Sequence, residues 1–596
     1  MRYSLPSKRK NNLSGGSLSR RRGQPDKKLG KQIADFCRHI AGSSQIAAAC
    51  IVGDYTLCER DPKKVLELLL VVHDFQPRLM NYIKVLGSKT IIFLAVDKWV
   101  FERDVDKGFL GEALAGKIIF PYVAITNEDY LHLQEVKLKK RLILELLETL
   151  VLDFPELSYN FHIKPEYFLY ETLMSRTRLF PPMIHNVLSF FQEDVKNRNV
   201  KLAMHGYLKA LRELEKEEAI ELSDGYAKFT KSFVERIESK KYRFVNLFKT
   251  AQRTLFASLL GAFSKTLSFL SENRGRFPKF HKDTGENSEV IHQLEDPLRY
   301  LFIPTAHGLV PLSNEMDIVA FARKMLSRGE EAEIEIGKIG GVLNDVYLIK
   351  AFVNGKEKRI VVKRFKDWSS FKWFPLNLWT LGTTTFAVSA RSRLDKECAI
   401  NQFLYDEGFD VPRILHVSHV KRLVFQEYIE GNKLNKTIRH VLKPKNDDDL
   451  ESSLNIINMV GEKFAEIHLL GIALGDTKPE NIMVRRKNKE ICLLDLEQAS
   501  RNGDKVWDIA EFLYYTGHYI PPLAGTRPAE LITKAFVRGY LKAGGDIKLV
   551  EKASNPKYTK VFSIFTLPHV ILTISNICGK ASELKRQSVD NRHSST

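Results

Sequence analysis

Cysteine is scarce in this chain of 596 residues, and no pair of cysteines has the short spacing of zinc ligands. The six cysteines stand at positions 37, 50, 58, 398, 492 and 578. Zinc sites commonly use closely spaced cysteine pairs, so the sequence gives no indication of a zinc centre. Because disulfides belong mainly to oxidising compartments, we expect reduced, mostly structural thiols and a cytoplasmic location.

Long apolar runs are also missing. Residues 561–577 are apolar, but they are short for a membrane span and contain Pro568 and His569, so we expect a buried helix there. A longer amphipathic stretch, residues 244–270, contains Lys and Arg, which keeps it out of a bilayer core. We therefore expect no transmembrane segment, with contact at a membrane surface as the alternative for 244–270.

Acidic residues are fewer than basic ones. The chain has 72 Asp and Glu against 91 Lys and Arg, a net charge of +19 and a pI near 9.4. This balance favours polyanionic partners, either RNA or DNA or an anionic membrane face. Residues 1–31 include Arg20–Arg22 and have no apolar core of a secretory signal, so we predict a disordered basic tail. A second disordered tail is predicted at 581–596.

One loop carries the residue types that phosphoryl transfer from ATP requires. It contains Asp476, Lys478 and Asn481, and Asp495 follows the next apolar run, as in the segments LGDTKPEN (474–481) and LLDLE (493–497). In such chemistry one carboxylate orients the attacking hydroxyl, while an Asn and a second Asp hold the metal on the phosphates. Helical periodicity before the loop and a strand hairpin after it, at 482–484 and 491–494, support this interpretation.

The preceding segments supply the expected ATP-clamping groups. Residues 360–363 are predicted to form a strand that ends in Lys363, whose charge would meet the phosphates. A helix over 393–405 would supply an acidic partner for it: Glu397 is best placed, with Asp395 and Glu407 as competitors. Gly341 stands in a glycine-containing hairpin that would cover the phosphates.

A strand at 423–431 runs into a glycine and resembles the hinge of protein kinases, where main-chain groups read the adenine edge; this resemblance implies that Gln426, Glu427 and Tyr428 are the readers. After the loop, Asp508 opens an apolar helix. It matches the buried Asp that braces the catalytic loop in protein kinases; capping of the helix is the alternative role, and the two are compatible. Between Lys363 and the Glu397 helix, residues 367–388 hold a dense aromatic insert, which we interpret as a docking surface or a lid.

Residues 330–545 resemble the protein-kinase superfamily. The loop is similar to H-R-D-L-K-P-E-N, and Asp495 stands where kinases carry the Asp of D-F-G. The loop has a Gly-Asp form, the D-F-G glycine is missing, and the sequence has no A-P-E segment. In these features the chain is similar to small atypical kinases, namely the RIO family and the kinase of the KEOPS complex. The similar segments include KECA (396–399) and YIEGNKL (428–434).

This resemblance implies a two-lobed fold and an ATP-dependent phosphotransferase, in particular an atypical Ser/Thr protein kinase with ATP and Mg²⁺ or Mn²⁺ as cofactors. It implies catalytic roles for Asp476 and Lys478 and metal binding by Asn481 and Asp495. It implies nucleotide binding by Gly341, Lys363, Glu397, Gln426, Glu427 and Tyr428. The alternatives are a small-molecule kinase, and a nucleotide-gated nucleic-acid-binding scaffold or ATPase with a kinase fold.

The remaining chain predicts a multidomain α/β and α+β architecture of three or four domains. An α/β domain is expected at 32–197. It resembles nucleotidyltransferases, with Glu67 and Asp97 in two of three carboxylate places and Val65 in the first, so we expect it to bind or scaffold and not to transfer nucleotides. A winged-helix-like segment at 198–240, a helical linker at 241–329 and C-terminal helices at 546–580 complete the expected organisation.

Overall fold

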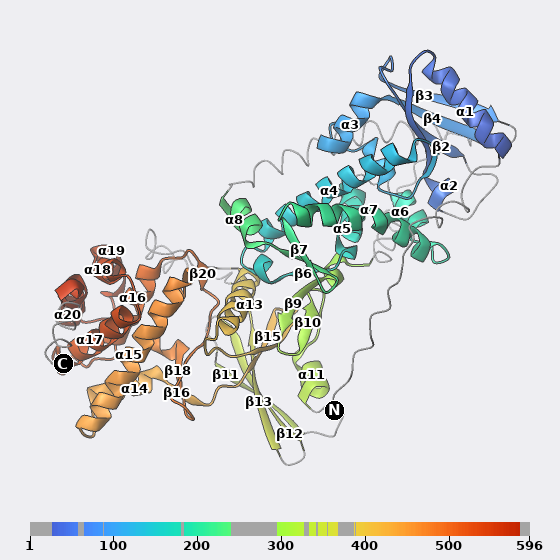
Figure 1. The fold of residues 1–596 in the computed structure, drawn as a ribbon. Coiled ribbons are helices and arrows are strands. Elements are labelled where there is room, and N and C mark those ends of the chain that lie inside the picture. The colour runs from blue at the N-terminus through green and yellow to red at the C-terminus, as the bar shows by residue number, and fades with distance from the viewer. Residues whose placement is uncertain are drawn as a thin grey trace, which may run out of the picture. The chain divides into compact units, whose positions relative to one another are not determined.

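A computed structural model describes most of the chain, and contacts divide it into two compact units (Figure 1). The described residues are 27–57, 65–86, 89–179, 184–239, 295–326, 333–340, 344–353, 356–367, 387 and 389–583. Most of the predicted basic tail, Gly341, most of the aromatic insert, the amphipathic stretch at 244–270 and the end of the C-terminal tail lie outside these ranges.

The units differ from the predicted domain boundaries because each combines separate parts of the chain. The first unit comprises Met1–Glu148, Pro165–Ile220 and Lys240–Glu295, and the second comprises Thr149–Lys164, Glu221–Ser239 and Asp296–Thr596. Short segments far upstream of residue 330 therefore belong with the predicted kinase-like region.

The first unit has a five-stranded mixed sheet in the order β3-β4-β2-β1-β5. Its strands are β1 (Ile46–Val52), β2 (Leu66–Val72), β3 (Leu79–Leu86), β4 (Lys89–Asp97) and β5 (Val123–Thr126). Strands β2 and β4 pair in parallel, and the other neighbours are antiparallel. Helix α1 (Lys27–Ala41) packs Ile33 and Cys37 into the core with the apolar side chains of β1, β2 and β4, as the near-continuous hydrophobic runs of these strands require.

The two carboxylates of the expected nucleotidyltransferase pattern do not come together. In the parallel pairing of β2 with β4, Glu67 lies opposite Ile92 and Asp97 lies opposite Val72. Five strand residues therefore separate them, roughly 16 Å along the sheet. Glu67 pairs instead with Lys117 at 2.8 Å, and Asp97 caps helix α3 (Lys98–Lys107) by accepting the Trp99 N–H at 3.0 Å. Glu67 and Asp97 are therefore too far apart to bind one pair of metal ions together.

The predicted winged-helix-like segment does not form a unit of its own. The helix is present as α7 (Lys196–Lys216) and the hairpin as β7 (Ile220–Ser223) and β8 (Tyr226–Phe229). Asp224 and Gly225 both have positive φ, as the predicted Asp-Gly turn requires. However, α7 belongs to the first unit, whereas the hairpin joins a sheet of the second unit with β6 (His162–Ile163), β9 (Leu301–Thr305) and β10 (Gly308–Pro311).

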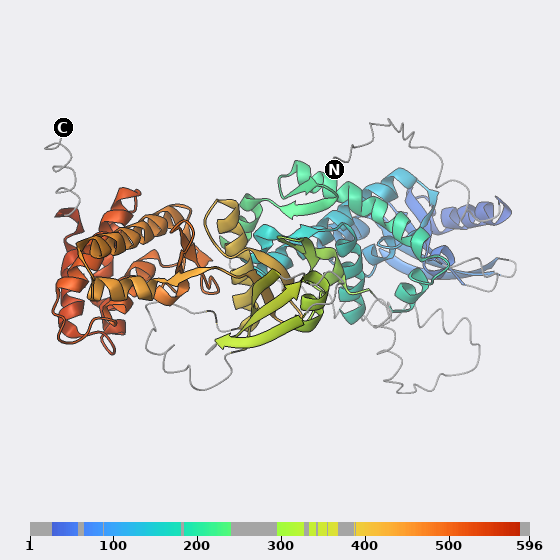
Figure 2. The ribbon, with the colours of Figure 1, turned by 90° about the horizontal axis from the view of Figure 1, so that it is seen from below.

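The second unit contains an antiparallel sheet in the order β11-β12-β13-β15-β14. In the chain, the long helix α13 (Ala390–Asp406) lies between β13 and β14. The strands are β11 (Glu333–Gly340), β12 (Asp345–Val353), β13 (Lys356–Arg364), β14 (Ile414–Ser418) and β15 (Leu423–Glu427). Figure 2 shows this sheet followed along the chain by a largely helical part. That part holds α14 (Leu434–Leu442), α15 (Asp447–Leu469), α16 (Lys505–Gly517), α17 (Arg527–Lys542), α18 (Ile547–Ala553), α19 (Pro556–Phe562) and α20 (Pro568–Gly579).

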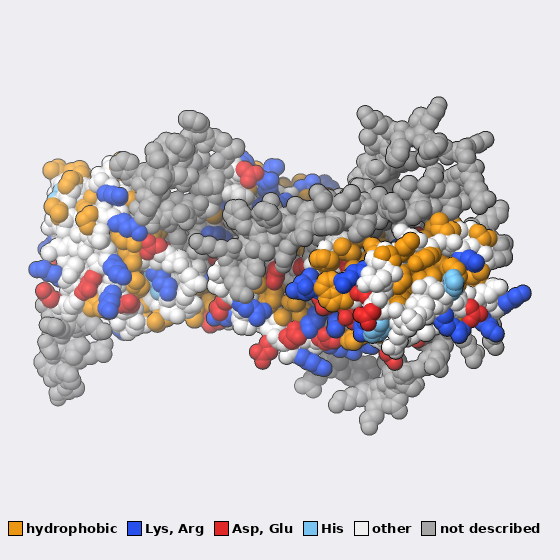
Figure 3. Space-filling model, turned by 90° about the horizontal axis from the view of Figure 1, so that it is seen from above, with side chains coloured by type: hydrophobic (Ala, Val, Ile, Leu, Met, Phe, Trp, Pro, Cys, Tyr) orange, Lys and Arg blue, Asp and Glu red, His pale blue; other side chains and the backbone are white. Residues whose placement is uncertain are grey.

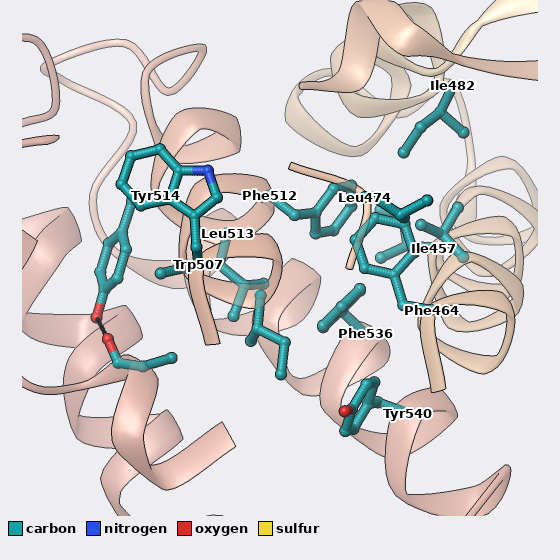
Figure 4. Close-up of a cluster of buried hydrophobic side chains, with 14 of the residues drawn as sticks. Ile457, Phe464, Leu474, Ile482, Trp507, Phe512, Leu513, Tyr514, Phe536 and Tyr540 are labelled. Carbon is teal, nitrogen blue, oxygen red and sulfur yellow. Dashed lines mark hydrogen bonds between the residues drawn. The ribbon is translucent and has the colours of Figure 1, made fainter. Parts of the chain in front are cut away.

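The core of the helical part is apolar and strongly aromatic (Figure 4). Phe464 of α15 meets Phe512 of α16 and Phe536 of α17 edge to face, with ring centroids 5.5 and 5.4 Å apart. The apolar residues at 561–577, expected as one buried helix, divide between α19 and α20, because Pro568 starts a new helix. Among the described residues, no helix has the length and apolar character needed to cross a membrane.

Helices α15 and α17 make direct backbone contact through two glycines. A Cβ built on Gly539 would overlap the carbonyl oxygen of Asn458, and one built on Gly461 would overlap that of Phe536. Main-chain atoms cannot move aside as a flexible side chain can, so any side chain at either position would force the helices apart.

We predict that Gly539→Ala lowers the free energy of unfolding by about 1–3 kcal/mol, the usual cost of overpacking a core. Gly579→Ala is the matched control, because its Cβ would meet only ordinary contacts at 3.6 and 3.9 Å from Ser554. Urea denaturation of both variants checks this, and equal stability of the two would contradict the close helix contact.

Candidate active site

Strand pairing brings Asn481 and Asp495 together. The loop leaves β17 (Ile472–Ala473), passes through a short 3₁₀ turn at Pro479–Asn481 and enters β18 (Ile482–Arg485), which pairs with β19 (Ile491–Leu493). In this hairpin Ile482 lies opposite Leu493, and the Leu494 N–H donates to the Asn481 carbonyl at 2.7 Å. The two predicted metal ligands therefore flank one end of the hairpin.

A buried carboxylate accepts hydrogen bonds from the backbone of the loop just before Asp476. Asp508 of α16 accepts the N–H groups of Leu474 at 2.6 Å and Gly475 at 2.8 Å, and its other close partner is His468 at 3.0 Å. The predicted bracing role of Asp508 is confirmed. The capping alternative is wrong, because the N-cap of α16 is Asp504.

No residue other than glycine fits at position 475 of the loop. The φ of Gly475 is +76°, and a Cβ there would stand 2.5 Å from the Gln498 carbonyl oxygen. The glycine that departs from the H-R-D pattern is thus demanded by local geometry.

Lys363 is buried between two carboxylates from distant parts of the chain. Its ammonium group lies 3.0 Å from Glu397 of α13 and 3.1 Å from Asp495. Burial lowers the pKa of Lys363, but the charges of Asp495 and Glu397 outweigh it, so the pKa is raised and the ammonium stays charged. Glu397 is the partner of Lys363 that the sequence favoured, whereas Asp395 pairs with His419 at 3.0 Å.

The predicted adenine-reading segment takes two different environments. The Gln426 side chain is buried and donates to Glu397 at 2.6 Å, so it orients the partner of Lys363. The Glu427 N–H donates to the Arg413 carbonyl at 3.0 Å, and the Tyr428 ring lies under the Arg359 guanidinium at 5.6 Å. The Gln426 backbone lies within the sheet, opposite Val361 of β13 and Ile414 of β14.

Asp476 lies in a paired and partly buried environment. Lys478 stands 3.0 Å from its carboxylate, and the Asn481 side chain donates to its backbone carbonyl at 3.2 Å. Burial raises the pKa of Asp476 and the charge of Asp495 adds to this, while Lys478 opposes it. The interaction with Asp495 places the predicted base and the predicted metal ligand within electrostatic reach of each other.

A buried polar network next to Asp495 was not found from the sequence. Arg393 of α13 donates to Asn344 at 2.7 Å and to Glu497 at 3.0 Å, and Asn344 donates to Glu497 at 2.5 Å. Burial and the charge of Asp495 raise the pKa of Glu497 to about 7. The sequence feature that could have indicated this network is a second acid, Glu497, at the place of the D-F-G glycine. Glu497 joins the loop after β19 to α13 and to the start of β12.

The donor set fits a hard divalent cation on phosphates. Asn481 and Asp495 offer an amide and a carboxylate oxygen, the ligand types that Mg²⁺ takes, and Mg²⁺ usually completes its shell with water and substrate phosphates. Within the described ranges, no group of three or more His, Cys, Asp or Glu side chains is arranged to hold a metal. A cation bound here would therefore depend on the nucleotide for further ligands.

Comparison of the chain with models of known protein families finds no match, and comparison with curated proteins finds none either.

Proposed function

We propose that the chain is an ATP-dependent phosphotransferase acting on a hydroxyl group, with a two-lobed kinase-like fold over residues 330–545 and the chemistry of an atypical Ser/Thr protein kinase. The observation that carries this proposal is the burial of Lys363 between Glu397 and Asp495, at 3.0 and 3.1 Å. The meeting of a lysine and two acids supports the proposal, because phosphate clamping and metal binding use these groups.

Lys363, Asn481 and Asp495 would hold the cofactor. Bound Mg-ATP supplies the phosphoryl group and neutralises the charge that develops during transfer. Lys363 would contact phosphate oxygens while Glu397 fixes the direction of its side chain. Asp495 has a φ of +60°, an uncommon conformation for a residue other than glycine, which supports a positioning constraint at this residue.

Asp476 would orient the acceptor hydroxyl and take its proton. Burial and Asp495 raise its pKa toward the range where a carboxylate is a useful base, and Lys478, 3.0 Å away, partly opposes this shift. Lys478 itself is near Glu511 at 3.9 Å, so its own charge is fixed in place. The position of Lys478 two residues after Asp476 supports Ser/Thr acceptors. A small-molecule hydroxyl is the alternative acceptor.

We predict that Asp476→Asn lowers the rate of phosphotransfer by about 10²–10⁴-fold, because a positioned base contributes this much. ATP affinity should stay near the original value, since Asp476 is proposed to meet the acceptor and not the nucleotide. Asp448→Asn, at an exposed position of α15, is the control. Labelled-ATP turnover on cell lysate and nucleotide titration provide the two measurements; parallel loss of binding and turnover would point to a structural role.

We predict that Lys363→Ala abolishes measurable phosphotransfer and weakens ATP binding, because it removes the phosphate clamp and leaves Glu397 buried without its cation. Lys356→Ala, exposed on the same strand, should leave both unchanged. Thermal unfolding of both variants identifies any loss of fold, and full turnover by Lys363→Ala would refute the assigned role.

We propose RNA or DNA as a second partner, and a cluster in the first unit favours it. Trp99 is 49% exposed, and the guanidinium groups of Arg78 and Arg103 lie over its ring at 5.5 and 5.2 Å. Exposed Phe109 lies beside it at 6.3 Å. Asp97 fixes this arrangement by accepting the N–H groups of Phe75 and Trp99.

Aromatic rings next to cations are the usual platform for unpaired bases and their phosphates. On the face drawn in Figure 3, hydrophobic side chains gather with Lys, Arg, Asp and Glu side chains around them. The excess of basic residues in the chain as a whole adds a sequence-independent attraction.

We predict that the chain binds single-stranded oligonucleotides with steep salt dependence and little sequence preference. Replacing both Arg78 and Arg103 by Ala should lower the salt slope by roughly 1.4, if each contacts one phosphate of a single strand. Replacing exposed Arg486 and Lys487 by Ala is the charge-matched control. Fluorescence anisotropy over a salt series measures the slope. Binding to anionic liposomes without binding to oligonucleotides would favour a membrane surface instead.

A further inference from the structure

Glu156, far upstream of the proposed kinase-like region, makes a two-pronged ion pair within the second unit. Its carboxylate accepts the backbone N–H of Arg501 at 3.0 Å and the Arg501 guanidinium at 2.7 Å. Both side chains are largely buried, with exposures of 13% and 15%. A charge-assisted contact made at two points, and shielded from water, fixes direction as well as distance.

The Arg501 guanidinium also lies between two aromatic rings. It lies 4.0 Å from the Tyr159 centroid and 5.0 Å from that of Phe403, which belongs to helix α13. The Tyr159 hydroxyl in turn donates to Glu238 at 3.4 Å. The cation–π contacts join the upstream segment to the helix that carries Glu397.

The backbone of Arg501 belongs to the catalytic segment. Strand β20 (Ser500–Arg501) pairs with β17, so that Arg501 lies opposite Ile472 and Ser500 opposite Ala473. Asp476 follows β17 by three residues, and Asp495 precedes Arg501 by six. The position of Arg501 is thus coupled to that of both proposed active-site carboxylates.

A second contact from the same upstream segment reaches α13. The Phe154 ring lies 5.9 Å from that of His419, and His419 pairs with Asp395 of α13 at 3.0 Å. Glu156 also raises the pKa of Lys396, partly offsetting the lowering by burial. Residues 154–159 are therefore linked to α13 on both sides of Glu397, through His419 to Asp395 and through Arg501 to Phe403.

We propose that Glu156, Tyr159 and Arg501 are positioning residues of the phosphotransferase, which we call the upstream clamp. The clamp holds α13 and the β17–β20 pair in register, so that Glu397 reaches Lys363 while Asp476 and Asp495 face the same nucleotide. This inference rests on the proposed function. It makes residues 149–164 part of the catalytic unit, although they lie outside the region that resembles kinases.

Three substitutions in the chain of 596 residues test the clamp. Glu156→Ala and Tyr159→Ala should each lower kcat by about tenfold to a hundredfold, the usual cost of misplacing reacting groups by about 1 Å. Tyr159→Phe keeps the ring over Arg501 and should retain nearly full activity. Glu462→Ala, which breaks the exposed pair with Lys542, is the matched control.

Cys398 reports on α13 without any need for turnover. It lies next to Glu397, is 1% exposed, and burial raises the pKa of its thiol well above the ordinary value, so it should resist alkylation. Its labelling by iodoacetamide is measured by peptide mass spectrometry. The labelling should rise in Glu156→Ala and Tyr159→Ala and stay low in Tyr159→Phe and Glu462→Ala.

Retained kcat together with unchanged Cys398 labelling in Glu156→Ala would overturn the clamp. An unchanged labelling with reduced kcat would overturn it as well, because the loss would then not pass through α13. If the unmodified chain transfers no phosphoryl group, the proposed function falls, and increased labelling in the two Ala variants would still establish that the upstream segment positions α13.

Discussion

The arrangement of the second unit depends on one buried cation. Lys363 ends a strand, Glu397 lies on a helix, and Asp495 follows a hairpin of the helical part, yet both carboxylates lie within 3.1 Å of the Lys363 ammonium group. A buried charge that loses its partner costs about 3–5 kcal/mol, so the strand that carries Lys363 and the helix that carries Glu397, with side chains 10% and 1% exposed, are held together. The neighbouring group of Arg393, Glu497 and Asn344 repeats this constraint with a second buried cation. Two adjacent charge clusters thus fix the geometry that the proposed chemistry uses.

The loop that carries Asp476 is constrained by different means. Asp508 accepts two of its backbone N–H groups, and Gly475 leaves no room for a side chain against Gln498. Below this, α15 and α17 touch through their backbones. The Asp476 carboxylate, paired with Lys478, is therefore carried by a loop whose main chain is fixed at several points. Such preorganisation is what an acid–base group requires to act without first paying for its own ordering.

Much of the candidate site could be predicted from short-range pattern. The strand hairpin after Asn481, the Lys363–Glu397 partnership and the brace at Asp508 each follow from local periodicity combined with the resemblance to kinases. The network at Glu497 and the contact of Arg501 with Glu156 could not be predicted, because the second joins residues 345 positions apart and neither has a local spacing signature. The separation of Glu67 from Asp97 could not be predicted from the sequence either, since it depends on the register between β2 and β4.

The interleaved order of the two units has a consequence for synthesis of the chain. Phe154, Glu156 and Tyr159 leave the ribosome long before α13 and β20 exist, so their aromatic and charged partners are missing for most of translation. Contacts with such large sequence separation must wait for the closure of a long loop, and folding that depends on them is slow. The first unit can complete its sheet early, whereas the second cannot close until nearly the whole chain has emerged. Its early segment spends that interval exposed, when association with other chains competes with correct folding.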